Sequence, residues 1–155
     1  MGAIINKIEY VLPEREITNQ DLQNEFPDYD FLKFEQKVGI KSRYIVSEGE
    51  TALDLAIRAC EKIFEGNIDK NEIDFILLCT QSPDYILPTT ACILQDKLSL
   101  RNDIGALDFN LGCSGYTYGL SLANGLIASN QAKKILLVTA ETYSKFIHKK
   151  DRTNR

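Results

Sequence analysis

A glycine-rich junction around Cys113 constrains what this chain can fold into. Residues 105–111 are mainly apolar and of strand length, and Gly112-Cys-Ser-Gly115 separates them from a helical pattern. Along that pattern Gly115, Gly119 and Ala123 recur every four residues, which gives the helix one small-residue face for close packing. The stretch therefore predicts a strand, a turn that carries a thiol, and a buried helix.

The place of Cys113 at this junction suits a nucleophile. A helix N-terminus presents unpaired N–H groups and the positive end of the macrodipole, and both stabilise a thiolate. Gly112 and Gly115 leave the backbone around the sulfur unobstructed. The alternative is a structural cysteine, because free cysteines are among the most buried residues and pack as small apolar side chains.

The other cysteines and the single histidine carry no metal-binding pattern. Cys60, Cys79 and Cys92 show no C-x-x-C spacing, and His148 is the only histidine of the chain. Neither a zinc site nor a disulfide framework is indicated. We expect these three cysteines to pack in the core and His148 to lie in a surface loop, and we expect no metal or cofactor.

Strand and helix patterns alternate along the chain, which favours an α/β layered fold with a mainly parallel sheet. The run 74–80 is continuously apolar, as expected for a strand buried on both faces. Thr51 is a plausible N-cap, as are residues 18–21 and Thr89 or Thr90. We expect strands at 3–12, 74–80, 106–111 and 134–140, and helices at 22–26, 28–37, 52–65, 90–98 and 115–129.

Length and charge limit the classes of protein. With 155 residues, 44% of them apolar, one domain with a genuine core is the natural expectation. The net charge of −4 provides no global field for binding nucleic acid. No run approaches the roughly 18 apolar residues of a membrane span, and no leader pattern is visible, which suggests a cytoplasmic protein with no membrane partner. The cation-rich stretch 37–43 is expected to be a solvated loop that turns at Gly39.

Residues 108–123 resemble the nucleophile segment of β-ketoacyl-acyl carrier protein synthase III, in the thiolase superfamily. The similarity extends through Gly39-Ile-Lys-Ser-Arg43 and Leu87-Pro88 to Asp151-Arg-Thr153. This resemblance implies a thiolase-like layered fold with a mainly parallel sheet and flanking helices. It also implies that residues 1–155 form an N-terminal half-domain, truncated before its last strand, with the C-terminal half absent.

The resemblance implies a function as well. Cys113 would take an acyl group from acyl-CoA, and the acyl-enzyme would condense with malonyl-acyl carrier protein as carbon dioxide leaves, which initiates fatty-acid synthesis. The family draws a catalytic His and Asn from its second half, so this chain alone is expected not to condense. Acyl-CoA and acyl carrier protein are the implied partners, and a homodimer is the implied assembly.

Three further positions match the family. Leu87 corresponds to a residue that reaches across the dimer into the neighbour's acyl pocket. Lys37 and Arg152 correspond to cations near the coenzyme A entrance, where they would meet phosphate charge. Ordinary loop packing for Leu87 and solvated cations for the other two are the alternatives. The family's adenine-stacking Trp is missing, because the chain has no Trp, and Phe31 or Phe34 could substitute.

Two other readings stay open at this point. The chain could be a non-catalytic half-domain that binds acyl carrier protein or a partner chain through its basic loops. It could also belong to a synthase III-like enzyme that uses a specialised primer, which the missing Trp and Leu87 leave possible.

Overall fold

The computed structural model describes residues 2–148, 150 and 151, and the chain divides into two compact units. The sheet unit comprises the first eleven residues and Thr51–Glu141. The small unit comprises Leu12–Glu50 and the segment from Thr142 onward. Arg152, one of the expected binding residues, lies outside the described residues. Whether the chain is one half of a larger domain stays a prediction.

Three parallel strands form the sheet of the sheet unit. They are β3 (Phe75–Cys79), β4 (Gly105–Phe109) and β5 (Ile135–Thr139), in the order β4-β3-β5. Their register pairs Cys79 with Phe109 on one side and with Thr139 on the other. All three strands therefore end at one edge, which we call the carboxyl edge. The expected strands at 74–80, 106–111 and 134–140 are confirmed, and each observed bound differs from the expected one by one or two residues.

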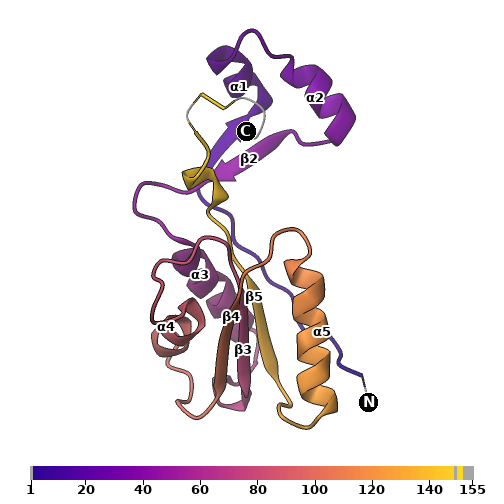
Figure 1. Cartoon of the computed structure of the whole chain (residues 1–155), viewed down its shortest axis with the longest axis vertical. Helices are drawn as coiled ribbons and strands as arrows, with labels where there is room; N and C mark the ends of the chain where they lie inside the picture. The colour runs from indigo at the N-terminus through magenta and orange to yellow at the C-terminus, as the bar shows by residue number, and fades with distance from the viewer. Residues whose placement is uncertain (1, 149, 152–155) are drawn as a thin grey trace. The chain divides into compact units, whose positions relative to one another are not determined.

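Helices cover both faces of this sheet (Figure 1). Helices α3 (Ala52–Phe64) and α4 (Thr90–Lys97) lie on one side, and α5 (Gly115–Ala128) lies on the other. Ile76 and Leu78 of β3 join α3 and α4 in the main core, where both side chains are fully buried. This arrangement confirms the layered α/β fold with a parallel sheet. A short 3₁₀ turn, η1 (Lys70–Glu72), precedes β3.

The small-residue face of α5 is buried, as the four-residue spacing predicted. Gly115, Gly119 and Ala123 are its buried residues. A Cβ added at Gly115 would lie 2.4 Å from Cys79 Sγ, and one added at Gly119 would lie 2.5 Å from Leu137 Cδ1. Since real Cβ atoms do not approach neighbours so closely, these glycines allow α5 to pack directly against the sheet.

Helix capping follows the sequence at α3 but not at α4. Thr51 is the N-cap, as expected, and it forms a capping box with Asp54 through reciprocal side-chain and backbone hydrogen bonds. Thr89 makes no such bond. Instead, Asp108 on β4 accepts hydrogen bonds of 2.6 Å from the backbone N–H groups of Thr90 and Ala91. The start of α4 is thus held by a strand that follows it in the chain.

Replacing Asp108 with alanine is expected to lower the free energy of unfolding by about 1–2 kcal/mol, because two amides at the start of α4 lose their acceptor. Urea unfolding of the chain measures this. The matched control is Thr89→Ala, which removes no capping bond and should change stability by less than about 0.5 kcal/mol. Equal losses in the two variants would contradict the assigned cap.

The expected strand at 3–12 is wrong. Residues 2–12 have no regular secondary structure, and side chains anchor them to the sheet unit. Asn124 Oδ1 accepts from the N–H of Ala3, and the Lys7 ammonium donates to the carbonyl of Lys62 at the end of α3. The segment has the β-branched composition typical of strands, but a strand exists only where another strand pairs with it.

The small unit contains two strands that the sequence did not reveal. Strand β1 (Arg15–Thr18) pairs antiparallel with β2 (Ser42–Ile45), so the expected solvated loop at 37–43 is wrong at its end. Between them lie α1 (Asn19–Glu25) and α2 (Phe31–Val38), near the expected positions. Gly39 ends α2 in the left-handed region, at φ 76°. A 3₁₀ turn, η2 (Tyr143–Lys145), also belongs to this unit.

The small unit has its own core, in which Phe31 is central. Phe31 is 1% exposed and packs with Ile17 and Leu22, with Tyr29 beside it at 4.8 Å between ring centroids. Phe31 therefore offers no free face on which an adenine could stack. Phe34 is only partly buried. Of the two residues expected to substitute for the missing Trp, only Phe34 therefore remains a candidate for stacking on an adenine.

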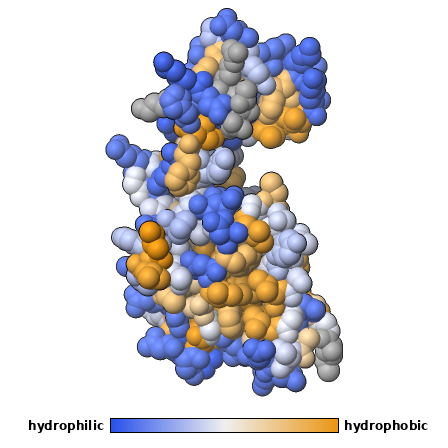
Figure 2. Space-filling model, in the orientation of Figure 1, coloured by the Kyte–Doolittle hydropathy of each residue, from blue (hydrophilic) through white to orange (hydrophobic). Residues whose placement is uncertain are grey.

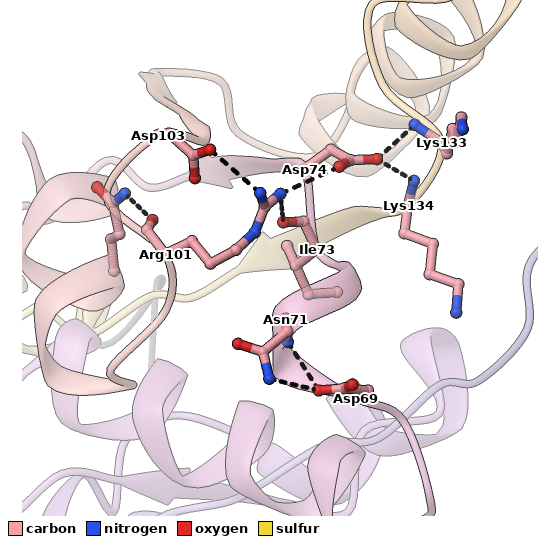
Figure 3. Close-up of polar contacts among 9 residues, drawn as sticks. Asp69, Asn71, Ile73, Asp74, Arg101, Asp103, Lys133 and Lys134 are labelled. Carbon is pink, nitrogen blue, oxygen red and sulfur yellow. Dashed lines mark hydrogen bonds and ion pairs between the residues drawn. The ribbon is translucent and has the colours of Figure 1, made fainter.

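A polar cluster joins the amino ends of the three strands, opposite the carboxyl edge (Figure 3). Asp74 Oδ2 accepts from the backbone N–H groups of Lys133 and Lys134 at 2.7 and 3.1 Å. Its other oxygen, Oδ1, lies 3.3 Å from Nη2 of Arg101, which also donates to the carbonyl of Ile73. These amide bonds hold the pKa of Asp74 below its ordinary value, with a smaller contribution from the Arg101 charge.

Apolar side chains also reach the surface of the sheet unit, and Figure 2 shows them gathered on the face turned to the viewer. The exposed large apolar residues of this unit include Ile86, Leu87, Leu107, Leu111, Tyr116 and Leu122. Among the described residues, no helix is both long and apolar enough to cross a lipid bilayer.

Candidate active site

Loops that leave the carboxyl edge of the sheet build the candidate site. Residues 80–82 follow β3, residues 110–114 follow β4, and residues 140–141 follow β5. The ladder continues one step beyond the strands, because the N–H of Thr80 donates to the carbonyl of Phe109 and that of Ala140 to the carbonyl of Cys79. Ligands of parallel α/β sheets bind outside this edge.

Cys113 lies in the turn between β4 and α5, as the sequence predicted. It is exposed and is not in a disulfide. Ser114 is the N-cap residue of α5, but its side chain makes no capping hydrogen bond. The thiol therefore stands at the start of a 14-residue helix whose cap residue does not cover the first amides with its own side chain.

Contacts from β3 and its loop support the turn that carries Cys113. Within the turn, the N–H of Gly115 donates to the carbonyl of Gly112 at 2.8 Å. The Cys79 thiol donates to the carbonyl of Leu111 at 3.2 Å. The Gln81 side chain lies against Gly112, where an added Cβ would be 3.2 Å from Gln81 Oε1. Both glycines of the junction thus have close neighbours that a larger residue would displace.

Glu141, directly after β5, binds the loop that follows β3. Its Oε1 accepts from the backbone N–H of Gln81 and from Thr80 Oγ1, the latter at 3.2 Å. Its Oε2 accepts from Ser82 Oγ at 3.2 Å. Thr80 and Ser82 are each 4% exposed, so one carboxylate serves two buried hydroxyls and a backbone amide. Glu141 is not among the site residues predicted from the sequence. Its position just after an expected parallel strand was the available signal.

The three other cysteines divide between buried and exposed positions. Cys60 and Cys79 are buried, as expected, and burial raises the pKa of Cys60 to about 12, with a further contribution from the Glu61 charge. The expectation that Cys92 packs in the core is wrong, because its side chain is exposed. Ala91 and Leu94 face the core from α4, and Cys92 faces outward beside Thr89.

The expected site residues that the structure describes are divided between the two units. Leu87 is 78% exposed in the segment between β3 and α4, so it lies in a loop that leaves the same edge as the Cys113 turn. Lys37 is exposed in the last turn of α2 and belongs to the small unit. His148 is exposed outside helices and strands, as expected, and its Nδ1 accepts from the N–H of Lys150. Within the described part of the chain, no group of three or more His, Cys, Asp or Glu side chains could hold a metal ion.

Sequence comparison finds relatives along nearly the whole chain. The family model for 3-oxoacyl-[acyl-carrier-protein (ACP)] synthase III matches residues 107–155. A β-ketoacyl-[acyl-carrier-protein] synthase III of Halalkalibacterium halodurans is 38% identical over 97% of this chain, and one of Thiobacillus denitrificans is 39% identical over 92%. The chain covers 45% of the length of each.

Comparison with solved structures finds the same kind of protein as the sequence comparison. A crystal structure of a 3-oxoacyl-(acyl-carrier-protein) synthase III matches 99% of this chain with a TM-score of 0.94 and 48% identity, and the match covers 46% of that protein. A 3-oxoacyl-(acyl-carrier protein) synthase of Burkholderia xenovorans matches 96% of this chain, and 44% of that protein, with a TM-score of 0.87 and 33% identity. The expected thiolase-like α/β fold is thus confirmed. By sequence and by fold, this chain is similar to β-ketoacyl-acyl carrier protein synthase III proteins, and it spans a little under half the length of the relatives it matches.

Proposed function

We propose that Cys113 accepts an acyl group from acyl-CoA, as the first step of a condensing enzyme of the synthase III type. The thiolate sulfur attacks the carbonyl carbon of the thioester, and a new C–S bond forms. The bond to the coenzyme A sulfur breaks, and coenzyme A leaves as a thiolate that takes up a proton. Condensation of the acyl-enzyme with malonyl-acyl carrier protein, with loss of carbon dioxide, would follow in the complete protein.

The observation that carries this proposal is the exposed thiol at the start of α5. A nucleophilic cysteine must be accessible and must lie in an environment that favours its thiolate, and the amino end of a helix provides such an environment. Of the two exposed cysteines of the chain, Cys113 occupies the turn beyond a strand end, whereas Cys92 lies within α4. The names of the relatives support the same chemistry.

The binding residues complete the proposal. Leu87 would line the acyl pocket of a neighbouring copy in a homodimer, which fits an apolar side chain left 78% exposed. Lys37 and Arg152 would meet the phosphates of coenzyme A. In this proposal the chain is the N-terminal half of the synthase, and the second half supplies the His and Asn that condensation requires.

A second candidate function is a non-catalytic half-domain that binds acyl carrier protein or a partner chain. The apolar residues on the surface of the sheet unit favour it, because an extended apolar surface marks an interface. A specialised primer is the remaining alternative, favoured by the burial of Phe31 in a chain without Trp.

Intact mass before and after incubation with a short-chain acyl-CoA tests the proposal. We expect the chain to gain one acyl group, and we expect the Cys113→Ala variant to gain none. The matched control is Cys92→Ala, which removes the other exposed thiol and should leave acylation unchanged.

Peptide mapping locates the acyl group. Acylation at Cys92, or no acylation of a folded chain, would contradict the assignment of Cys113 and favour the binding module. A panel of branched, aromatic and straight-chain donors distinguishes a specialised primer from a short one.

A further inference from the structure

The loop 80–82 forms the support beneath the Cys113 turn. The Gln81 side chain lies against Gly112, the residue before Cys113. One residue earlier in the chain, the N–H of Thr80 donates to the carbonyl of Phe109, where β4 ends. A displacement of this loop would therefore move the turn that carries the thiol.

Glu141 is what ties this loop to β5. Inside the loop, the N–H of Ser82 donates to Thr80 Oγ1 at 3.0 Å, and this local hydrogen bond stabilises the turn of the loop itself. The Thr80 and Ser82 hydroxyls and the Gln81 N–H all donate to the Glu141 carboxylate. Glu141 is itself fixed, because the N–H of Ala140 donates to the carbonyl of Cys79.

We propose that Glu141 is a positioning residue for Cys113, acting through residues 80–82 and the Gln81 side chain. The proposal rests on the proposed role of Cys113. Three hydrogen bonds to one carboxylate hold the loop, the loop holds Gly112, and Gly112 sets the place of the thiol at the start of α5. Small misplacements of a reacting group lower rates by orders of magnitude, so this chain of contacts would matter for reaction at the thiol.

The rate of alkylation by iodoacetamide, followed at each cysteine by peptide mass spectrometry, tests the proposal in the full chain. Cys92 is the internal reference for reagent access, and the buried Cys60 and Cys79 report unfolding. We expect Glu141→Ala to lower the rate at Cys113 about tenfold relative to Cys92. Glu141→Gln should lower the Cys113 rate less, because the amide oxygen of the new side chain still accepts from the Gln81 N–H.

Glu72→Ala is the matched control, since it removes a carboxylate paired with Lys134 at the opposite edge of the same sheet. The ratio of the Cys113 and Cys92 rates should not change in this variant. An unchanged ratio in a folded Glu141→Ala chain would overturn the proposal. A higher alkylation rate at Cys113 in both Glu141 variants would also overturn the proposal. That result would show that Glu141 affects the thiol through its negative charge and not by positioning the loop.

A further variant decides the case in which Glu141→Ala unfolds, which rapid labelling of Cys60 and Cys79 would reveal. Gln81→Ala keeps the backbone amide and all three contacts of Glu141, and removes only the side chain against Gly112. A lower alkylation rate at Cys113 relative to Cys92 in this variant supports the proposal, and an unchanged ratio of the two rates overturns it.

Acylation by a short-chain acyl-CoA, measured in parallel, separates this proposal from the proposed function. Altered alkylation in a chain that never accepts an acyl group would overturn the proposed function and leave the positioning role standing. Normal acylation in Glu141→Ala would overturn the positioning role and leave the proposed function standing.

Discussion

Replacing Gly115 with alanine is expected to lower the free energy of unfolding by about 2 kcal/mol, although alanine is the better helix former. The added methyl group would lie 2.4 Å from Cys79 Sγ and 3.5 Å from Leu111 Cβ. Cys79 is 4% exposed on a central strand, so its sulfur has little room to move away. Either the start of α5 or the end of β3 must shift.

Gly125 provides the matched control within the same helix. A Cβ added there meets nothing within 4 Å, so Gly125→Ala should raise the free energy of unfolding by about 0.5–1 kcal/mol. In a Cys79→Ala background, Gly115→Ala should cost less than about 0.5 kcal/mol, because the sulfur that obstructs the methyl group is gone. Urea unfolding of the parent chain, Gly115→Ala, Cys79→Ala and the double variant measures this double-mutant cycle. Stabilisation by Gly115→Ala in the parent chain would contradict the packing described here.

Replacing Asp74 with alanine is expected to lower the free energy of unfolding by about 2–3 kcal/mol. The change removes the acceptor for two backbone amides that precede β5 and the partner of Arg101 (Figure 3). Asp103→Ala is the control, since the Asp103 side chain pairs with the same Arg101 but is 74% exposed. It should change stability by less than about 0.5 kcal/mol. Urea unfolding at neutral pH compares the two.

Acid provides an independent measurement of the Asp74 contribution. The folded chain holds the pKa of Asp74 below its ordinary value of 3.8, chiefly through the N–H groups of Lys133 and Lys134. A lowered pKa stabilises the fold when the group is ionised, so the contribution is complete above the ordinary value and is lost as the pH falls through the folded-state value. The stability difference between the parent chain and Asp74→Asn should therefore shrink on acidification below about pH 4. A difference that stays constant would show that the charge of Asp74 contributes nothing.

The elements that the sequence predicted correctly are those whose signals are local. The apolar run at 74–80, the Thr51 N-cap and the spacing of Gly115, Gly119 and Ala123 each lie within one segment, and each led to the observed element. The turn that carries Cys113 was predictable for the same reason, because strand, glycines and helix are contiguous.

The errors arose where the outcome depends on a partner elsewhere in the chain. Residues 3–12 have strand composition, but no strand pairs with them among the described residues, whereas the polar segment Arg15–Thr18 pairs with Ser42–Ile45. Cysteine is a residue type that usually packs in a core, yet the packing of α4 turns the Cys92 side chain outward. Burial and pairing are tertiary properties, and tertiary context overrides local preference.

By itself, the sequence determined the alternation of strands and helices, the thiol-bearing junction and the similarity to synthase III proteins, because these depend on contiguous residues. Only the tertiary structure decided that Asp108 holds the start of α4 and that Glu141 holds the loop beneath Cys113. Glu141 lies about sixty positions from the hydroxyls it binds. Only the parallel register, which aligns the ends of β3, β4 and β5, brings such residues within hydrogen-bonding distance.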